Sequence, residues 1–258
     1  AALTFDMIRS GLLLTAAVAA GALWTAVAMG QEAEPSEPAS VGLRPAWIAC
    51  REVQEPDIAG VLEETTHWVQ VGTERFLVVN RPAVGAAPRV TLLFLTDESG
   101  APDGHTRSGM LRKGLARHGW HTFFARLDVG SLSADARLAQ LQGLLDCARD
   151  NGSDGLVAGV VEGGAGHLVL PLASRLSSDG FVILNLPPPR TSGHASRNAL
   201  SVMQTPSLLV QESPLGWPED QAVGPGVHLL RLPPGHSGRD DDRELRRLRG
   251  WLQHQAAG

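Results

Sequence analysis

Short apolar runs alternate with helix-like patterns along most of the chain. The run VTLLFL (90–95) is continuous and apolar, which is typical of a strand buried on both faces of a sheet, and FVILNL (181–186) predicts another strand. Two shorter runs flank Gly72 and Thr73, a pair that suits a hairpin turn. The predicted strands are residues 67–71, 75–80, 90–95, 121–127, 155–161, 181–186, 207–211 and 227–232.

Helical spacing of apolar residues fills several of the intervals between these strands. Residues 106–119 form one such pattern, which Gly119 ends, and Ser133 is placed to cap the next. A third pattern follows at residues 166–176, where Pro171 must kink or shorten the helix. Three aspartates at 240–242 suit the amino end of a closing helix. Strands alternating with helices predict an α/β fold: a mostly parallel sheet with helices on both faces, opened by an antiparallel hairpin, in an α/β-hydrolase-like order.

The amino end has the layout of a secretory signal. After Met7 and Arg9, residues 11–29 carry no charge, and small residues follow at the possible cleavage points after Ala28 or Gly30. We therefore assign residues 7–30 to a signal peptide that directs the chain to the periplasm. The alternative is an uncleaved anchor in the inner membrane formed by residues 11–29.

Proline-rich, acidic sequence follows the signal, most clearly in residues 31–46. We assign residues 31–60 to a linker and residues 61–258 to a single α/β-hydrolase-like domain. Cys147 lies on an apolar helical stripe, which favours a buried free thiol, and its pairing with Cys50 stays open.

The net charge of -5 is spread along the chain and indicates no basic patch, so nucleic acid is not expected as a partner. No cysteine and histidine spacing indicates a metal site, and no cofactor is expected. The expected partners are an unknown small molecule or an envelope protein, with a membrane only if the amino-terminal segment stays uncleaved.

The glycine-rich stretch GLVAGVVEGGAGHLVLPLA (155–173) lies where an α/β hydrolase keeps its nucleophile. In the G-x-S-x-G elbow, the nucleophile occupies a strained turn between a strand and a helix. One register uses Gly159, Gly163 and Gly164 and places Val161, which has no reactive group, at the nucleophile position. A second centres Glu162, whose carboxylate could act as a nucleophile, and a third centres Gly163 and is inert.

The other parts of a hydrolase site are only partly present. His236 follows the last strand, where a triad histidine belongs, and Glu212 ends the preceding strand as a candidate acid. Glu219 and Asp220 lie further on in the loop as alternative acids. An exposed loop histidine is an equal reading of His236, and solvated carboxylates are the alternative reading of all three acids. Asp97 and Glu98 follow the first buried strand, where an oxyanion loop would lie, and their charge would repel a developing oxyanion.

Three anchors carry a resemblance to a known family. These are Leu115 to Trp120, the turn at Gly159 to Gly164, and Arg249-Gly250-Trp251-Leu252 near the carboxyl end. The chain thereby resembles a bacterial family of exported proteins of unknown function within the α/β-hydrolase superfamily. The resemblance spans roughly residues 65 to 255. It implies the fold and an elbow without serine, but no reaction.

Three roles remain open from the sequence. The first is a pseudo-hydrolase, a non-catalytic envelope protein that binds a small molecule or a protein partner. It predicts that Val161 points into an apolar pocket. The second is an ester hydrolase with a non-standard site, in which Glu162 acts with His236. A purely structural role in an envelope assembly would be indicated by a large exposed apolar patch.

Overall fold

The structure is a computed structural model that describes residues 47–53, 64–85, 90–97, 107–128, 130, 132–152, 154–187, 194–212, 223–232 and 241–257. All elements belong to one compact unit, Leu43–Gly258, which has its own hydrophobic core and is therefore able to fold alone. None of the described helices is both long enough and apolar enough to cross a membrane. The elements are β1 (Trp47–Val53), β2 (Thr65–Val71), β3 (Glu74–Arg81), β4 (Val90–Thr96), α2 (Arg107–Arg117), β5 (His121–Arg126), α3 (Ala134–Asn151), β6 (Leu156–Glu162), α4 (Ala165–Val169), η1 (Leu170–Arg175), β7 (Gly180–Leu184), α5 (His194–Val202), β8 (Ser207–Glu212), β9 (Val227–Leu232) and α6 (Asp241–Gln255).

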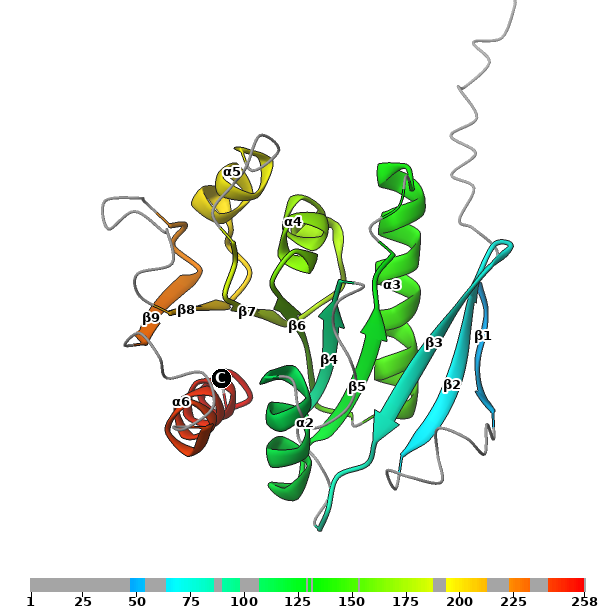
Figure 1. Ribbon diagram of the computed structural model, residues 1–258, viewed down its shortest axis with the longest axis horizontal. Coiled ribbons are helices and arrows are strands. Elements are labelled where there is room, and N and C mark those ends of the chain that lie inside the picture. Colours follow the sequence, from blue (N-terminus) through cyan, green and yellow to red (C-terminus); the bar gives the residue numbers. More distant parts are fainter. Residues whose placement is uncertain are drawn as a thin grey trace, which may run out of the picture. The chain divides into compact units, whose positions relative to one another are not determined.

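The nine strands form one sheet in the order β1-β2-β3-β5-β4-β6-β7-β8-β9 (Figure 1). The first three strands pair antiparallel, and β3 pairs antiparallel with β5. From β5 onward every neighbouring pair is parallel. The predicted fold class is therefore confirmed: a mostly parallel sheet opened by antiparallel strands.

Strand β1 lies inside the range that the sequence analysis assigned to the linker. It pairs with β2 from Trp47 opposite Val71 to Val53 opposite Thr66, with an irregularity between Ile48 and Arg51. The sheet thus begins before residue 61. Residues 7–30, and the clearest linker sequence at 31–46, lie outside the described residues.

Helices cover both faces of the sheet, and each face has its own apolar core. One face packs against α3, α4, η1 and α5, and its core includes Leu144, Val169 and Leu200. The opposite face packs against α2 and α6 through Leu111, Leu115, Leu248 and Leu252. Figure 1 shows α2 and α6 together on this second face.

Local sequence signals set most of the element ends as expected. Gly72 (φ 61°) lies in the β2–β3 turn, and Gly119 (φ 85°) follows α2, as left-handed residues should. The Ser133 side chain accepts a hydrogen bond from the Ala136 backbone N–H at the start of α3. Pro171 shortens the next helix, because α4 ends at Val169 and continues as the 3-10 helix η1. Helix α5 was missing from the sequence prediction.

A disulfide joins Cys50 of β1 to Cys147 of α3, with the two Cα atoms 5.4 Å apart. The expectation of a buried free thiol at Cys147 is therefore wrong. Its helical stripe does face the core, but the edge strand that brings Cys50 beside it was not predicted from sequence. Asn151 donates hydrogen bonds to the Cys147 carbonyl and to Cys50 Sγ at the same place.

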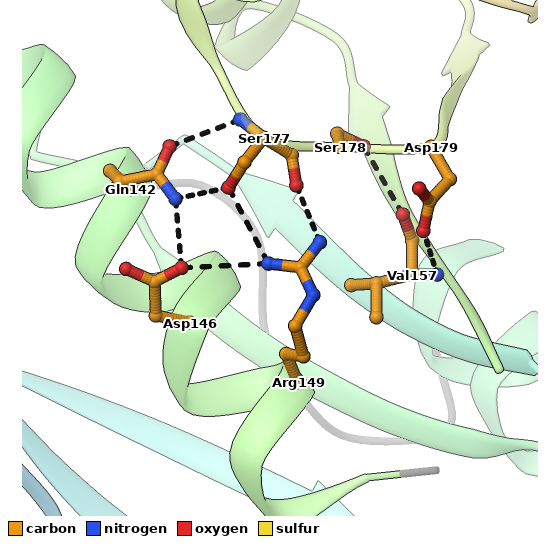
Figure 2. Close-up of polar contacts among 7 residues, drawn as sticks. All are labelled: Gln142, Asp146, Arg149, Val157, Ser177, Ser178 and Asp179. Atoms are coloured by element: carbon orange, nitrogen blue, oxygen red, sulfur yellow. Dashed lines mark hydrogen bonds and ion pairs between the residues drawn. The ribbon is translucent and has the colours of Figure 1, made fainter. Parts of the chain in front are cut away.

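Polar contacts fix the segment between η1 and β7 at the edge of the sheet where β6 and β7 begin (Figure 2). Gln142 of α3 accepts from the Ser177 backbone N–H at 3.1 Å and donates to the Ser177 hydroxyl. Arg149 donates to the Ser177 carbonyl at 2.6 Å. Asp179 accepts from the Val157 backbone N–H at 2.7 Å. These contacts hold the starts of β6 and β7 in place. They thereby help to position the carboxyl ends of the same two strands.

A buried ion-pair cluster joins α2 to the opening strands. The Glu64 carboxylate accepts from Arg81 Nε at 2.8 Å and from Arg112 Nη2 at 3.2 Å. The Arg112 side chain is 1% exposed and lies 5.2 Å from the centre of the Phe124 ring. Burial lowers the pKa of Arg112 to about 10, against the opposing effect of Glu64, so it stays charged at neutral pH.

Candidate functional site

The carboxyl ends of β4, β6, β7 and β8 meet at one edge of the sheet, where ligands bind in open α/β folds. The parallel register fixes this alignment. Leu95 of β4 lies opposite Val161 of β6, and Glu162 lies opposite Leu184 of β7. The glycine turn after β6 is therefore at the centre of the edge.

The turn itself consists of Gly163 and Gly164, between β6 and α4. Gly163 has φ 60°, in the left-handed region that residues with a side chain rarely adopt. Its backbone N–H donates to the Leu184 carbonyl at 3.0 Å, which ties the turn to β7. A hydrolase holds its nucleophile at the strained residue of this turn. The geometry therefore favours the register centred on Gly163, which has no side chain.

Val161 does not point into a pocket, contrary to the expectation from sequence. Its side chain is 0% exposed and belongs to the core beneath α3 and α4. Gly159 lies two residues earlier on the same side of the strand, where an added Cβ would come within 2.8 Å of the Phe181 ring. Both residues therefore serve the packing of the core, and neither reaches the turn.

The Glu162 side chain lies on the other side of β6, toward α2. Its Oε2 accepts a hydrogen bond from the hydroxyl of Ser108, which is buried in the first turn of α2. That first turn contains no acidic residue of its own. A carboxylate at a helix amino end is stabilised by the helix dipole. Glu162 is thus the anionic partner of the amino end of α2, which is a structural role.

Asp97 follows β4 and lies over the glycine turn. A Cβ added to Gly164 would lie 2.6 Å from Asp97 Oδ2, and one added to Gly163 would lie 4.0 Å from the same atom. In a hydrolase elbow, the backbone N–H after the nucleophile stabilises the oxyanion. A carboxylate oxygen thus lies beside Gly164, the residue that would supply this N–H if Gly163 stood at the nucleophile position.

Of the two predicted triad partners, the structure describes only Glu212. His236 lies outside the described residues. Glu212 ends β8, and its backbone N–H donates to Asn185 Oδ1 at 3.2 Å. Asn185 follows β7 with φ 47°, and it is the one residue other than glycine with positive φ in the described chain. Strain of this kind clusters at functional sites, and no sequence pattern indicated it.

A serine and a histidine meet on the helices next to the turn. His167 Nδ1 of α4 lies 2.9 Å from Ser196 Oγ of α5. Burial lowers the pKa of His167 below its usual value, and a hydrogen bond to the Pro187 carbonyl partly offsets this. Ser196 is 1% exposed, so the pair packs α5 against α4. The sequence analysis missed this contact because it did not predict α5.

Comparison with known proteins agrees with this fold. The sequence model of a family described as "Protein of unknown function (DUF3530)" matches residues 10–135, a range that ends before the glycine turn. No curated protein matches the chain.

Solved structures of α/β hydrolases superpose on most of the chain. Est1E from Butyrivibrio proteoclasticus matches with a TM-score of 0.56 and 8% identity, over 75% of this chain and 99% of that one. An α/β serine hydrolase without a lid from Xanthomonas campestris matches with a TM-score of 0.51 and 15% identity, over 74% and 93%. An esterase from Pyrococcus furiosus matches with a TM-score of 0.52 and 10% identity, over 80% and 90%. At these identities the likeness shows the α/β-hydrolase fold alone.

Proposed function

We propose that this chain is an exported, non-catalytic protein that uses the α/β-hydrolase fold to bind a small molecule or a protein partner. The observation that carries the proposal is the conformation of Gly163. It occupies the strained position of the strand-to-helix turn with φ 60° and has no group that could attack a substrate.

The position of Asp97 supports the same proposal. An acyl-transfer site needs hydrogen-bond donors where the oxyanion forms. Here a carboxylate oxygen would approach a Cβ on Gly164 to 2.6 Å. Restoring a serine at Gly163 would leave that carboxylate beside Gly164, which adds a second difference between this turn and a hydrolase elbow.

The proposed location is the periplasm, by way of the signal in residues 7–30, or the outer surface of the inner membrane if residues 11–29 stay as an anchor. The Cys50–Cys147 disulfide supports export, because disulfides form and persist in oxidising compartments. The apolar run of residues 11–29 supports it independently.

The test is reaction with a fluorophosphonate probe, which labels serines activated by a neighbouring base. The purified domain, residues 31–258, would be incubated with the probe beside an active α/β serine esterase, and labelling read as a mass increase. Short and long acyl esters would be assayed on the same preparation. We expect no labelling and no turnover. Stoichiometric labelling, or ester turnover by the pure protein, would overturn the proposal.

The second candidate function is an ester hydrolase with a non-standard site. The observation that favours it is the 2.9 Å contact between Ser196 and His167, a distance suited to a nucleophile and its base. The arrangement inferred from sequence, Glu162 acting with His236, belongs to the same class.

Variants separate these two arrangements if turnover is found. Loss of both labelling and turnover in Ser196→Ala would assign the chemistry to Ser196. Loss of turnover in both Glu162→Gln and His236→Ala, with Ser196→Ala fully active, would assign it to the carboxylate. Full activity in either Glu162→Gln or His236→Ala would exclude the second arrangement.

A further inference from the structure

Helices α2 and α6 are far apart in sequence but lie together on one face of the sheet (Figure 1). Gly114 of α2 allows their close approach, since a Cβ at this position would lie 2.9 Å from Leu245 Cδ2 of α6. Leu111 and Leu248 point into the shared core. Helical periodicity therefore turns the opposite sides of both helices outward.

Five basic side chains lie outside the shared core on these two neighbouring helices, and we call them together the basic face. Its members are Lys113, Arg117, Arg246, Arg247 and Arg249. All but the half-buried Arg249 are exposed. The sequence analysis expected no basic patch, because charge is spread along the chain. Packing brings together two basic segments that the sequence separates.

Little negative charge accompanies the basic face on these two helices. Helix α2 has no acidic residue, and the acidic residues of α6 all lie in its first four positions. Among these, Glu244 is buried and paired with Arg107. Within the described part of the chain, Lys113, Arg117 and Arg247 take part in no ion pair. Their charge is therefore not neutralised by the described fold.

We propose that the basic face docks the domain on a bilayer that contains anionic phospholipids. Clustered Lys and Arg side chains are attracted to such a surface without needing a pocket. This proposal concerns a surface away from the glycine turn and goes beyond the proposed function, so either can fail alone.

The amino-terminal sequence favours a membrane over other polyanions. Residues 11–29 are an uncharged apolar segment with Arg9 just before it. Residues 30–46 separate this segment from β1, and seventeen residues span at most about 60 Å when fully extended. An uncleaved segment would thus keep the domain within reach of the bilayer, and a newly exported chain would be released beside it.

The test compares vesicles of pure phosphatidylcholine with vesicles that also contain phosphatidylglycerol. The domain, residues 31–258, would be co-sedimented with each kind, so that the apolar segment does not contribute. We expect clear preference for the anionic vesicles and loss of that preference as salt is raised, because ions screen exposed charges. Equal partition into both kinds of vesicle at low salt would overturn the proposal.

A matched pair of variants tests the location of the interaction. The triple variant Lys113→Gln, Arg117→Gln and Arg247→Gln removes three charges from the basic face. Each basic side chain near an anionic surface changes the partition coefficient onto the vesicles about fivefold. If the three contributions are independent, the triple variant should bind the anionic vesicles about a hundredfold more weakly.

The control removes three exposed charges elsewhere, Arg75→Gln, Arg126→Gln and Arg175→Gln. It should bind almost as well as the unmodified domain. Equal loss in both triple variants would mean an effect of net charge and would overturn the proposal. Binding to double-stranded DNA without preference for anionic vesicles would overturn it too and would assign the face to a nucleic acid.

Discussion

Removal of the Cys50–Cys147 disulfide should strongly lower the free energy of unfolding. The bridge closes a loop between residues separated by 97 positions. In the chain-entropy account, a loop of about this length stabilises the folded state by about 4.7 kcal/mol. This is an upper value, because residual structure in the unfolded chain reduces the entropy that the bridge removes.

The assay is urea unfolding of residues 31–258 with and without a reductant. The free energy of unfolding is expected to fall by about 3 kcal/mol for each molar of urea. Loss of the full stabilisation by the disulfide would therefore lower the urea concentration at the unfolding midpoint by about 1.5 M. Free thiols would be titrated in the denatured protein before reduction, and none is expected. The double variant Cys50→Ser and Cys147→Ser is the control, and its midpoint should not respond to the reductant.

Two results would refute this reasoning. Two titratable thiols in protein purified from an oxidising compartment would mean that the bridge does not form. A midpoint unchanged by reduction, in protein without free thiols, would mean that β1 contributes nothing to the cooperative fold. The first result would also remove one of the two supports for export.

Three further predictions follow from the buried and half-buried charges. Glu64→Gln should lower the free energy of unfolding by about 3–5 kcal/mol, because it removes the negative charge that faces the buried Arg112 guanidinium; a loss below about 1 kcal/mol in urea unfolding would contradict this. Glu162→Gln should cost about 1 kcal/mol of stability, as expected for a weakened hydrogen bond, and should leave esterase assays unchanged at background. Burial lowers the pKa of His121 and His167 below 6.5, so below that pH the unfolded chain binds more protons than the folded chain. The urea midpoint should therefore fall between about pH 7.5 and about pH 5.5, and a rise on acidification would count against the assigned burial.

The sequence predicted the fold class and every described strand except β1, because the signals of those strands are local. A continuous apolar run such as residues 90–95 indicates a strand wherever it lies, and Gly72, Ser133 and Pro171 act on residues within one turn of themselves. Helix α5 escaped prediction because His194–Val202 has few large apolar residues and Leu200 alone among them is fully buried.

The candidate site was harder to predict because several alternatives have the same local pattern. Glycines at 159, 163 and 164 allow three registers of the turn. The choice among them depends on the left-handed conformation of Gly163 and on its hydrogen bond to Leu184 of the neighbouring strand. That bond exists only once β6 and β7 are paired.

The sequence by itself thus determined most of the strands and helices, with β1 and α5 as exceptions, and that the glycine turn has no serine. Tertiary structure alone decided that Asp97 lies over that turn, that Glu162 serves α2, and that Cys50 meets Cys147. It also decided that α2 and α6 combine their charges into the basic face. The physical reason is range: periodicity and turn conformation depend on neighbours along the chain, whereas charge proximity and disulfide pairing depend on residues that only the folded sheet brings together.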